Sequence, residues 1–344
     1  MISKGELTRL VVNLKPTIDK YNKNSKYGPL SFFEVYTALA FVYFKQKKAD
    51  FAVLETGLGG RLDATNVVKP LVCAIAPISY EHTQKLGNTL REIATEKAGI
   101  IKSQVRRRKS QALIVISAPQ EKEAMEVIRN RCKEVGAKLY EVGKDVGFRV
   151  QGSGLRVQGL AGKYTDLRIR LLGRHQLINA TVAIGVIEAL RNYNINVSVD
   201  SIRKGFYNTV WPGRCEIISK NPLVVLDGAQ NVVSSRALKE AIRKNFKYRK
   251  LILVLGVSND KDIKGICREL TGLADAVILT QACSPRATEP GTLASYFKGK
   301  EIYLTNNVKE AVDLTKQKSG PKDLILVTGS LFVVGEAREI IFRR

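Results

Sequence analysis

The stretch Leu54-Glu-Thr-Gly-Leu-Gly-Gly-Arg-Leu-Asp-Ala-Thr-Asn66 decides the fold of this chain. It continues an apolar run at 51–54, which predicts a short buried strand. In open parallel sheets ligands bind at the carboxyl ends of strands, and this loop is expected at such an end. Glu55 could hold Mg²⁺ there, because that ion prefers oxygen ligands, and the glycines let backbone N–H groups approach a ligand closely. A tight turn with a capping acid is the alternative interpretation.

Helix and strand signals surround this loop. A Ser or Thr followed three residues later by Glu predicts helix starts at Ser3, Ser31 and Thr89. Further strands are predicted at 71–76 and 112–116, followed by a helix at 121–135.

The second half of the chain alternates strands and helices. Short segments separated by glycines at 148–172 predict a small antiparallel sheet, and a long helix is expected at 176–193. Trp211-Pro-Gly-Arg214 then interrupts the pattern, so we predict two domains, 1–210 and 211–344. Strands are predicted beyond it at 223–226, 251–255, 276–280 and 324–327. This alternation favours a parallel sheet covered on both faces, so the predicted fold class is α/β in both domains.

Length and composition exclude several classes of protein. The chain has 344 residues, of which 44% are apolar, so it can form two domains with sizeable cores. No apolar run reaches the roughly 18 residues of a membrane helix, and the first residues do not form a signal peptide. Five scattered cysteines without a C-x-x-C pair suit a reducing cytoplasm.

A formal net charge of +24 raises the question of nucleic-acid binding. Lys and Arg are spread along the whole chain, and the one dense run is Arg-Arg-Arg-Lys at 106–109. No RNP, KH or zinc-finger pattern accompanies that run. We therefore expect no nucleic-acid partner and no membrane partner, although the charge favours small polyanions such as nucleotides.

Three further loops carry polar residues that could act on a ligand. Glu81-His82 could bind a metal or move a proton, with a solvated loop as the alternative. Asp227-Gly-Ala-Gln-Asn231 and Thr328-Gly-Ser330 follow predicted strands, where a helix start can bind an anion. The sequence contains no G-x-x-x-x-G-K-[ST] motif and therefore no Walker A loop. It also contains no G-x-G-x-x-G opening a helix, which disfavours a dinucleotide oxidoreductase.

Taken together, these stretches resemble the folylpolyglutamate synthase/dihydrofolate synthase family of Mur-type amide ligases. The matching segments follow the family's order: Ser31-Phe-Phe-Glu34, the 54–66 loop, Leu86-Gly-Asn-Thr89, Glu96-Lys-Ala-Gly-Ile-Ile-Lys102, Gly173-Arg-His-Gln-x-x-Asn179, 211–214, 227–231 and Thr328-Gly-Ser-Leu331. The resemblance implies a P-loop-type ATPase domain followed by a Rossmann-like C-terminal domain. It also implies ATP and Mg²⁺ as cofactors. In the implied reaction a folate or dihydropteroate carboxylate becomes an acyl phosphate, which the amine of L-glutamate attacks.

The same resemblance implies roles for single residues. The implied catalytic and metal-binding residues are Glu55 and His82, each on a Mg²⁺ ion, and Lys97, which would be carbamylated. The implied ATP-binding residues are Asn179 on the adenine, Arg214 near the phosphates, Asp227 on the ribose, and Gln230. The implied pterin-site residues are Phe33, Asp63 and Ala64.

Three departures from the family pattern affect the expected activity. The family's first strand and its Gly-Thr-Asn-Gly-Lys-Gly-Ser phosphate loop are missing from this sequence, so we expect an incomplete first domain, from a truncated gene model or a shortened paralogue. Glu81 stands where the family has Asp, and Gln230 stands where it has His. A non-catalytic nucleotide- or folate-binding paralogue is therefore the alternative function. A monomer is expected, and the choice between folate and dihydropteroate stays open.

Overall fold

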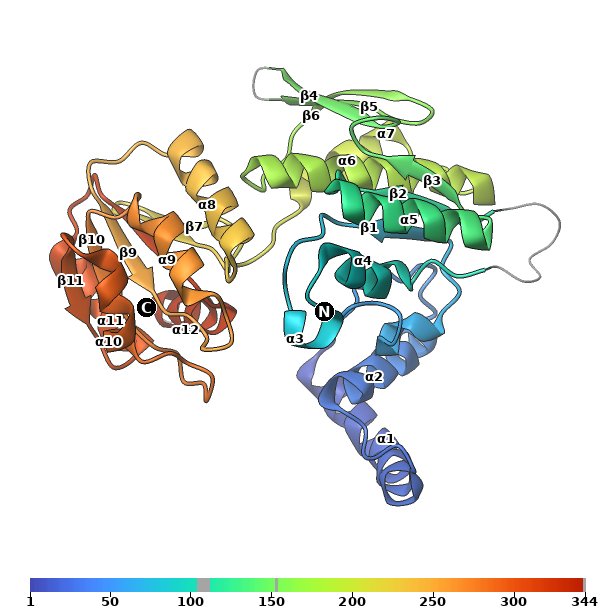
Figure 1. Ribbon diagram of the computed structural model, residues 1–344, viewed down its shortest axis with the longest axis horizontal. Coiled ribbons are helices and arrows are strands. Elements are labelled where there is room, and N and C mark those ends of the chain that lie inside the picture. The colour runs from blue at the N-terminus through green and yellow to red at the C-terminus, as the bar shows by residue number, and fades with distance from the viewer. Residues whose placement is uncertain (104–111, 152–153, 343–344) are drawn as a thin grey trace. The chain divides into compact units, whose positions relative to one another are not determined.

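The chain packs as two compact units (Figure 1). The computed structural model describes residues 1–103, 112–151 and 154–342. One unit comprises Met1–Glu141 with Ala189–Asn194, and the other comprises Val142–Glu188 with Ile195–Arg344. The division into domains 1–210 and 211–344 remains a prediction. No helix within the described residues has both the length and the apolar character needed to cross a membrane.

Two helices open the first unit, α1 (Lys4–Asn24) and α2 (Phe32–Gln46). Each begins after the predicted Ser, whose hydroxyl accepts the N–H of a Glu three residues later, while that Glu accepts the N–H of the Ser. Such a capping box satisfies N–H groups that the first helical turn leaves without partners. α4 (Leu90–Ala98) begins in the same way after Thr89. All three predicted helix starts are confirmed.

A three-stranded parallel sheet lies at the centre of this unit. Its strands, in spatial order, are β1 (Val72–Ile75), β2 (Ile114–Ser117) and β3 (Lys138–Glu141). α4 and α5 (Lys122–Val135) pack against each other, and their buried side chains share a core with the strands. β1, β2 and α5 confirm the prediction. β3 was not predicted because Lys-Leu-Tyr-Glu is short and half polar. The basic run at 106–109 lies outside the described residues.

Residues 51–54 do not form the predicted strand. The segment belongs to no sheet, and its Val53 is 97% exposed. A strand needs a neighbour that takes up its backbone N–H and C=O groups, and none of the described strands pairs with this segment. Its apolar side chains predicted burial, but burial also requires a sheet around them.

The second unit begins with an antiparallel sheet, which confirms the prediction for 148–172. Its strands are β4 (Gly147–Gln151), β5 (Gly154–Gln158) and β6 (Lys163–Leu167). The predicted helix at 176–193 is formed by α6 (Arg174–Ala189) and the 3-10 helix η2 (Leu190–Tyr193), and α7 (Val199–Asn208) follows. The buried carboxylate of Glu188 accepts the backbone N–H groups of Leu160 and Ala161 and the hydroxyl of Tyr164, which ties the β5–β6 turn to α6.

A six-stranded sheet with the order β11-β10-β9-β12-β8-β7 forms the core of this unit. Neighbouring strands are parallel, except that β7 is antiparallel to β8. The strands are β7 (Glu216–Lys220), β8 (Leu223–Leu226), β9 (Leu251–Leu255), β10 (Ala276–Leu279), β11 (Glu301–Leu304) and β12 (Leu324–Thr328). The four predicted strands are confirmed. The two edge strands, β7 and β11, were not predicted because polar side chains interrupt their apolar pattern.

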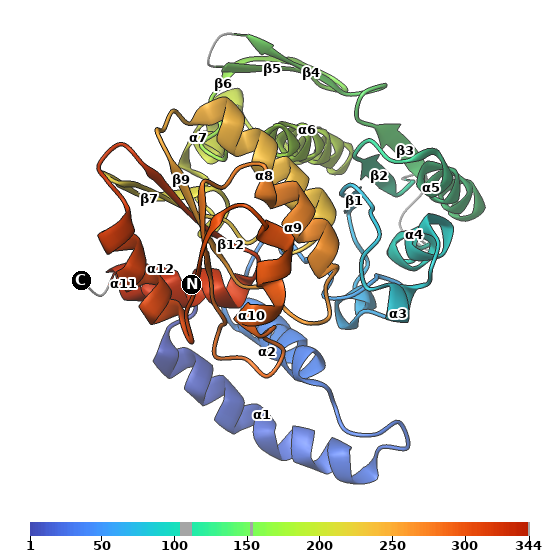
Figure 2. The same cartoon turned by 60° about the vertical axis from the view of Figure 1, so that its left-hand side comes forward.

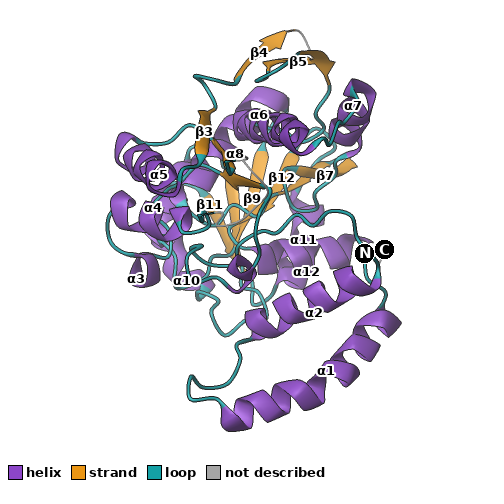
Figure 3. Cartoon of the chain, turned by 90° about the vertical axis from the view of Figure 1, so that its right-hand side faces the viewer, coloured by secondary structure: helices purple, strands orange, loops and turns teal. Residues whose placement is uncertain are grey.

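Helices cover both faces of this sheet, as predicted (Figures 2 and 3). Leu251, Leu253 and Leu255 of β9 pack with α8 (Val232–Asn245) and α9 (Ile263–Thr271). The alternate residues Ile252 and Val254 pack with α11 (Val308–Lys318) and α12 (Leu331–Phe342). The short helices α10 (Pro290–Leu293) and η3 (Ala294–Phe297) precede β11. Because successive side chains of a strand point to opposite faces, this continuous apolar pattern requires a cover on each side.

Replacing Leu253 with Ala should lower the free energy of unfolding by about 2–5 kcal/mol, because its fully buried side chain leaves a cavity in the core. Urea unfolding followed by circular dichroism measures this change. Val233→Ala on α8, where the side chain is 54% exposed, is the matched control and should change the value by less than about 0.5 kcal/mol. Equal losses in both variants would contradict the placement of Leu253 in the core.

Candidate functional site

The glycine loop of the first unit is organised around the carboxylate of Asp63, which is 9% exposed. Its Oδ2 accepts the N–H groups of Gly57 and Leu58, each at 2.9 Å. Its Oδ1 accepts the N–H of Thr65 at 3.0 Å and the hydroxyl of Thr65 at 2.5 Å. Burial by itself would raise the pKa of Asp63, but the Thr65 hydroxyl and the three amides together hold that pKa below its usual value. Asp63 therefore fixes the path of the loop.

The same loop is attached to the end of α4, the helix that carries Lys97. The N–H of Arg61 donates to the C=O of Glu96 at 2.8 Å, and the guanidinium of Arg61 donates to the Glu96 carboxylate at 2.9 and 3.1 Å. A Cβ on Gly60 would lie 2.8 Å from the carbonyl oxygen of Lys97, so only glycine fits there. The half-buried Lys97 is thus held at a fixed position next to the loop.

The predicted pterin-site residues lie on or beside this loop. The ring of Phe33, on α2, lies so close to the backbone of Gly57 that a Cβ there would be 2.5 Å from it. Ala64 begins the 3-10 helix η1 (Ala64–Val67), whose N-cap is Asp63. The structure therefore brings Phe33, Asp63 and Ala64 into one region, while their role in binding a substrate stays a prediction.

The predicted metal ligands do not form a ready-made cage. Glu55 is exposed. His82 caps α3 (Thr83–Leu86) with a φ of 52°, and its Nε2 lies 3.9 Å from Oε1 of Glu81. Among the residues that the structure describes, no three Asp, Glu, His or Cys side chains gather around a possible metal position. Mg²⁺ often takes only one or two protein carboxylates and completes its shell with water and nucleotide phosphates, and Glu55 fits a site of that kind.

In the second unit, Asp227 lies directly after β8 and is also 9% exposed. Its two oxygens accept the N–H groups of Cys215 at 2.8 Å and Ala229 at 2.9 Å. Burial raises the pKa of Asp227, and the two amides and the nearby Arg214 guanidinium offset part of that shift. The loops at 211–214 and 227–231 are therefore joined at the carboxyl end of β8, which brings the predicted ATP-binding residues Arg214 and Asp227 together.

His175 and Asn179 are linked through Gln176 on α6. Nδ2 of Asn179 donates to Oε1 of Gln176 at 3.2 Å, and Nε2 of Gln176 lies 3.1 Å from Nε2 of His175. Burial lowers the pKa of His175 and the nearby Arg214 lowers it further, against an opposing effect of Glu240, so this imidazole is neutral at pH 7. Arg214 thus lies close to both His175 and Asp227.

The start of α8 fixes the loop that contains Gln230. Oδ1 of Asn231 accepts the N–H of Ser234 at 2.8 Å. The hydroxyl of Ser234 accepts the N–H groups of Gln230 and Asn231, each at 3.1 Å. The side chain of Gln230 is half-buried at a helix start, a place that favours a negatively charged ligand. Its assignment to ATP stays a prediction.

Sequence analysis missed two buried threonines near the same edge of the sheet. Thr280 follows β10, and the N–H of Thr288 donates to the C=O of Val257, which comes shortly after β9. Among the described residues, the hydroxyls of Thr280, Thr288 and Thr328 are buried without a hydrogen-bond partner. A buried polar group without a partner costs free energy, so these hydroxyls are candidates for contact with a ligand. For Thr280 the signal was a hydroxyl residue directly after an apolar strand.

Comparisons with known proteins match both halves of the chain. The family model described as "Mur ligase middle domain" matches residues 18–187, and "Mur ligase, glutamate ligase domain" matches 213–331. A Bacillus subtilis dihydrofolate synthase/folylpolyglutamate synthase is 31% identical, over 98% of this chain and 78% of its own length. A Mycobacterium tuberculosis folylpolyglutamate synthase solved with ADP and AMPPCP has a TM-score of 0.90 at 31% identity and covers 100% of this chain and 80% of its own. Escherichia coli FolC in complex with DHPP and ADP has a TM-score of 0.82 at 30% identity, over 92% of this chain and 72% of its own.

Replacing Asp63 with Asn should lower the free energy of unfolding by about 1–3 kcal/mol at pH 7, because a hydrogen-bonded carboxylate is lost from the loop. The folded-state pKa of Asp63 lies below its unfolded value, so its stabilisation is present above about pH 4 and is lost as the pH falls through the folded pKa. The difference between the two proteins should therefore shrink at low pH.

Urea titrations from pH 7 down to pH 3 measure this difference. Asp19→Asn, on the exposed Lys15–Asp19 pair, is the matched control, with an effect of at most about 0.5 kcal/mol. A pH-independent difference for Asp63→Asn would show that the carboxylate does not hold the loop.

Proposed function

We propose a reaction for this chain on the premise that it belongs to the folylpolyglutamate synthase/dihydrofolate synthase family of Mur ligases. The matches confirm the α/β Mur-ligase fold that the resemblance implied, and the ligases of this family form C–N bonds. The proposed reaction joins L-glutamate to a carboxylate of folate or dihydropteroate at the expense of ATP. In support, similar proteins have been solved with ADP and AMPPCP, and with DHPP and ADP.

The proposed chemistry has two steps. A carboxylate oxygen of the acceptor attacks the γ-phosphorus of ATP, and the bond to the bridging oxygen breaks to release ADP. The amine of glutamate then attacks the carbonyl carbon of the acyl phosphate, loses a proton and expels phosphate. Both steps move negative charge, so they require fixed donors and cations around the transferring group.

The second unit supplies donors suited to a nucleotide. Asp227 keeps acceptor capacity on both oxygens beyond the two amides that it binds, which suits ribose hydroxyls. The exposed guanidinium of Arg214 suits a phosphate. We assign the adenine to Asn179 and a phosphate contact to Gln230.

In our proposal the second unit also contains the segment that binds L-glutamate. The family model described as a glutamate ligase domain spans Thr280, Thr288 and Thr328. Their buried, unpartnered hydroxyls can donate to a carboxylate or accept from an ammonium group.

The observation that best supports the proposal is that the glycine loop is attached to the turn of α4 that contains Lys97. Glu55 would hold one Mg²⁺ ion and His82 a second, with Lys97 as a carbamate facing the metal, and these ions would neutralise charge on the transferring phosphoryl group. Phe33, with Asp63 and Ala64, would line the site of the pterin ring. The monomeric state also belongs to the proposal.

The test supplies ATP, Mg²⁺, radiolabelled L-glutamate and either dihydropteroate or a reduced folate, and measures labelled folyl product and ADP. Wild-type protein should label at least one acceptor. Lys97→Ala and Glu55→Ala should each lower the rate by about 10²–10³, because each removes a charge that acts on the transferring phosphoryl group.

Lys133→Ala, an exposed lysine on α5, is the matched control and should leave the rate unchanged. Normal turnover in Lys97→Ala would refute its assignment. Tight binding of ATP or folate with no labelled product would favour a non-catalytic binding protein instead.

A further inference from the structure

Positive charge is concentrated where the parallel strands of the six-stranded sheet begin, which we call the amino-terminal edge of the sheet. Because β8 to β12 are parallel, the segments that precede them lie along one edge, and β7, antiparallel to β8, ends at that edge. We call the nine basic residues of these segments the basic edge: Lys220, Lys244, Lys247, Arg249, Lys250, Lys298, Lys300, Lys318 and Lys322. This edge is opposite to the carboxyl ends of the parallel strands, where Asp227 and Thr280 lie.

Three acidic residues share this edge, and the first of them, Asp323, is bound to the protein itself. Its side chain is 1% exposed and accepts Nε of Arg249 at 3.1 Å and the N–H of Gly320 at 2.8 Å. Asp323 therefore neutralises Arg249 and anchors the segment before β12, and its carboxylate does not face solvent.

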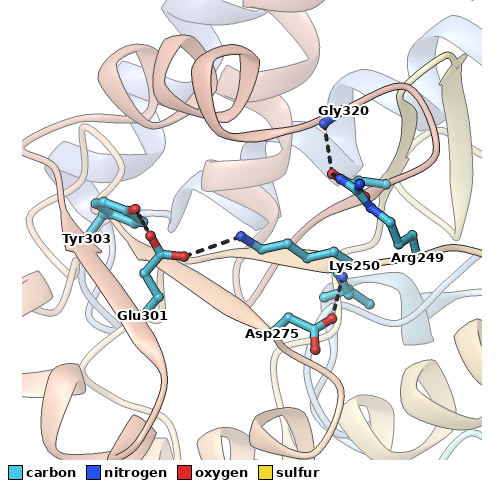
Figure 4. Close-up of polar contacts among 8 residues, drawn as sticks. Arg249, Lys250, Asp275, Glu301, Tyr303 and Gly320 are labelled. Carbon is cyan, nitrogen blue, oxygen red and sulfur yellow. Dashed lines mark hydrogen bonds and ion pairs between the residues drawn. The ribbon is translucent and has the colours of Figure 1, made fainter.

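The other two acids are held in the same way. Oδ2 of Asp275 accepts the N–H of Leu251 at 2.7 Å. Glu301 accepts Nζ of Lys250 at 3.3 Å and also the hydroxyl of Tyr303 (Figure 4). All three acids thus face the protein's own donors, and two cations of the basic edge are neutralised.

Most of the remaining positive charge has no acidic partner. Within the described part of the chain, six lysines of the basic edge form no ion pair: Lys220, Lys244, Lys247, Lys298, Lys300 and Lys322. All are exposed except Lys300, which is half-buried. Strands in a sheet lie about 4.8 Å apart, so the row from β11 to β8 is about 19 Å long.

We propose that the basic edge binds the phosphate backbone of nucleic acid without sequence preference. One strand of a B-form duplex presents a phosphate about every 3.4 Å along the helix axis, so a row of this length spans about five or six phosphates. Eight of the nine residues are lysines, which act as point charges and do not read bases by paired hydrogen bonds. The surface is assembled from separate segments of the chain, so no continuous sequence motif identifies it. For this reason motif analysis favoured no nucleic-acid partner.

Two other partners fit this edge less well. A membrane surface is disfavoured because stable docking takes inserted apolar side chains in addition to a basic patch. The loops of this edge, at 221–222, 246–250, 272–275, 298–300 and 319–323, contain none of the large exposed apolar residues of the described chain. A protein partner is disfavoured because lysine is depleted at protein interfaces, where aromatic residues and arginine are enriched. A phosphate backbone requires no more than the row of cations that is present.

The test measures fluorescence anisotropy of a labelled 20-base-pair DNA duplex with the full chain at 50–300 mM NaCl. The edge variant is Lys247→Gln/Lys298→Gln/Lys322→Gln. The control variant, Lys144→Gln/Lys163→Gln/Lys204→Gln, removes the same charge from exposed lysines elsewhere in the second unit. At 100 mM NaCl the edge variant should bind at least tenfold more weakly than wild type, and the control within about threefold of it. The magnitude of the slope of log K against log salt should fall by about 2.7 in the edge variant, at about 0.9 per lost contact.

Several outcomes would overturn the proposal. Equal losses in the two variants would mean that net charge, and not this edge, attracts the oligonucleotide. A wild-type chain that does not bind at 50 mM NaCl would refute nucleic-acid binding, and edge-dependent binding of phosphatidylserine vesicles without binding of the oligonucleotide would assign the edge to membranes. Glutamate ligation is not a readout here, so failure of the proposed reaction leaves this test intact.

Discussion

The hydrogen bonds that the loop at 54–66 donates to Asp63 are the interaction on which the candidate site of the first unit depends. A glycine-rich loop has many accessible backbone conformations, and ordering it costs conformational entropy. Four donors from Gly57, Leu58 and Thr65 converge on the two oxygens of one carboxylate and offset that cost. Because Arg61 then attaches the loop to Glu96, the same carboxylate also determines where the backbone of Lys97 lies relative to the glycines.

Asp227 has a corresponding role in the second unit, with a different electrostatic outcome. It also accepts backbone N–H groups with both oxygens, but it accepts only two of them and no hydroxyl, so desolvation raises its pKa, whereas that of Asp63, with four donors, is lowered. The neighbouring Arg214 partly compensates this cost and also lies close to the neutral imidazole of His175. A bound ligand with hydroxyl donors would relieve the same cost, which makes this strand end a favourable place for one.

Local sequence signals predicted most of the fold because they act within a few residues. Capping boxes marked α1, α2 and α4, and continuous apolar runs marked the central strands β8, β9, β10 and β12. The prediction for 51–54 was wrong because a strand depends on a neighbour that its own residues do not specify. The motifs identified the positions of Asp63 and Asp227, but not their hydrogen-bond partners, and the unpartnered hydroxyl of Thr288 follows only from tertiary packing.

The parallel strands of the six-stranded sheet give the second unit two chemically independent rims. One rim lies at the carboxyl ends of these strands and the other at their amino ends. Each crossover helix carries the chain from one rim back to the other, and the rims are joined through strands of four or five residues, of which β8, β9, β10 and β12 have buried central residues. Polar and charged residues at the amino-terminal rim can therefore change during evolution without affecting the rim that carries Asp227 and Thr280. Adaptation of surface charge to the salt content of a cell would then proceed at one end of the sheet while selection for chemistry holds the other end constant.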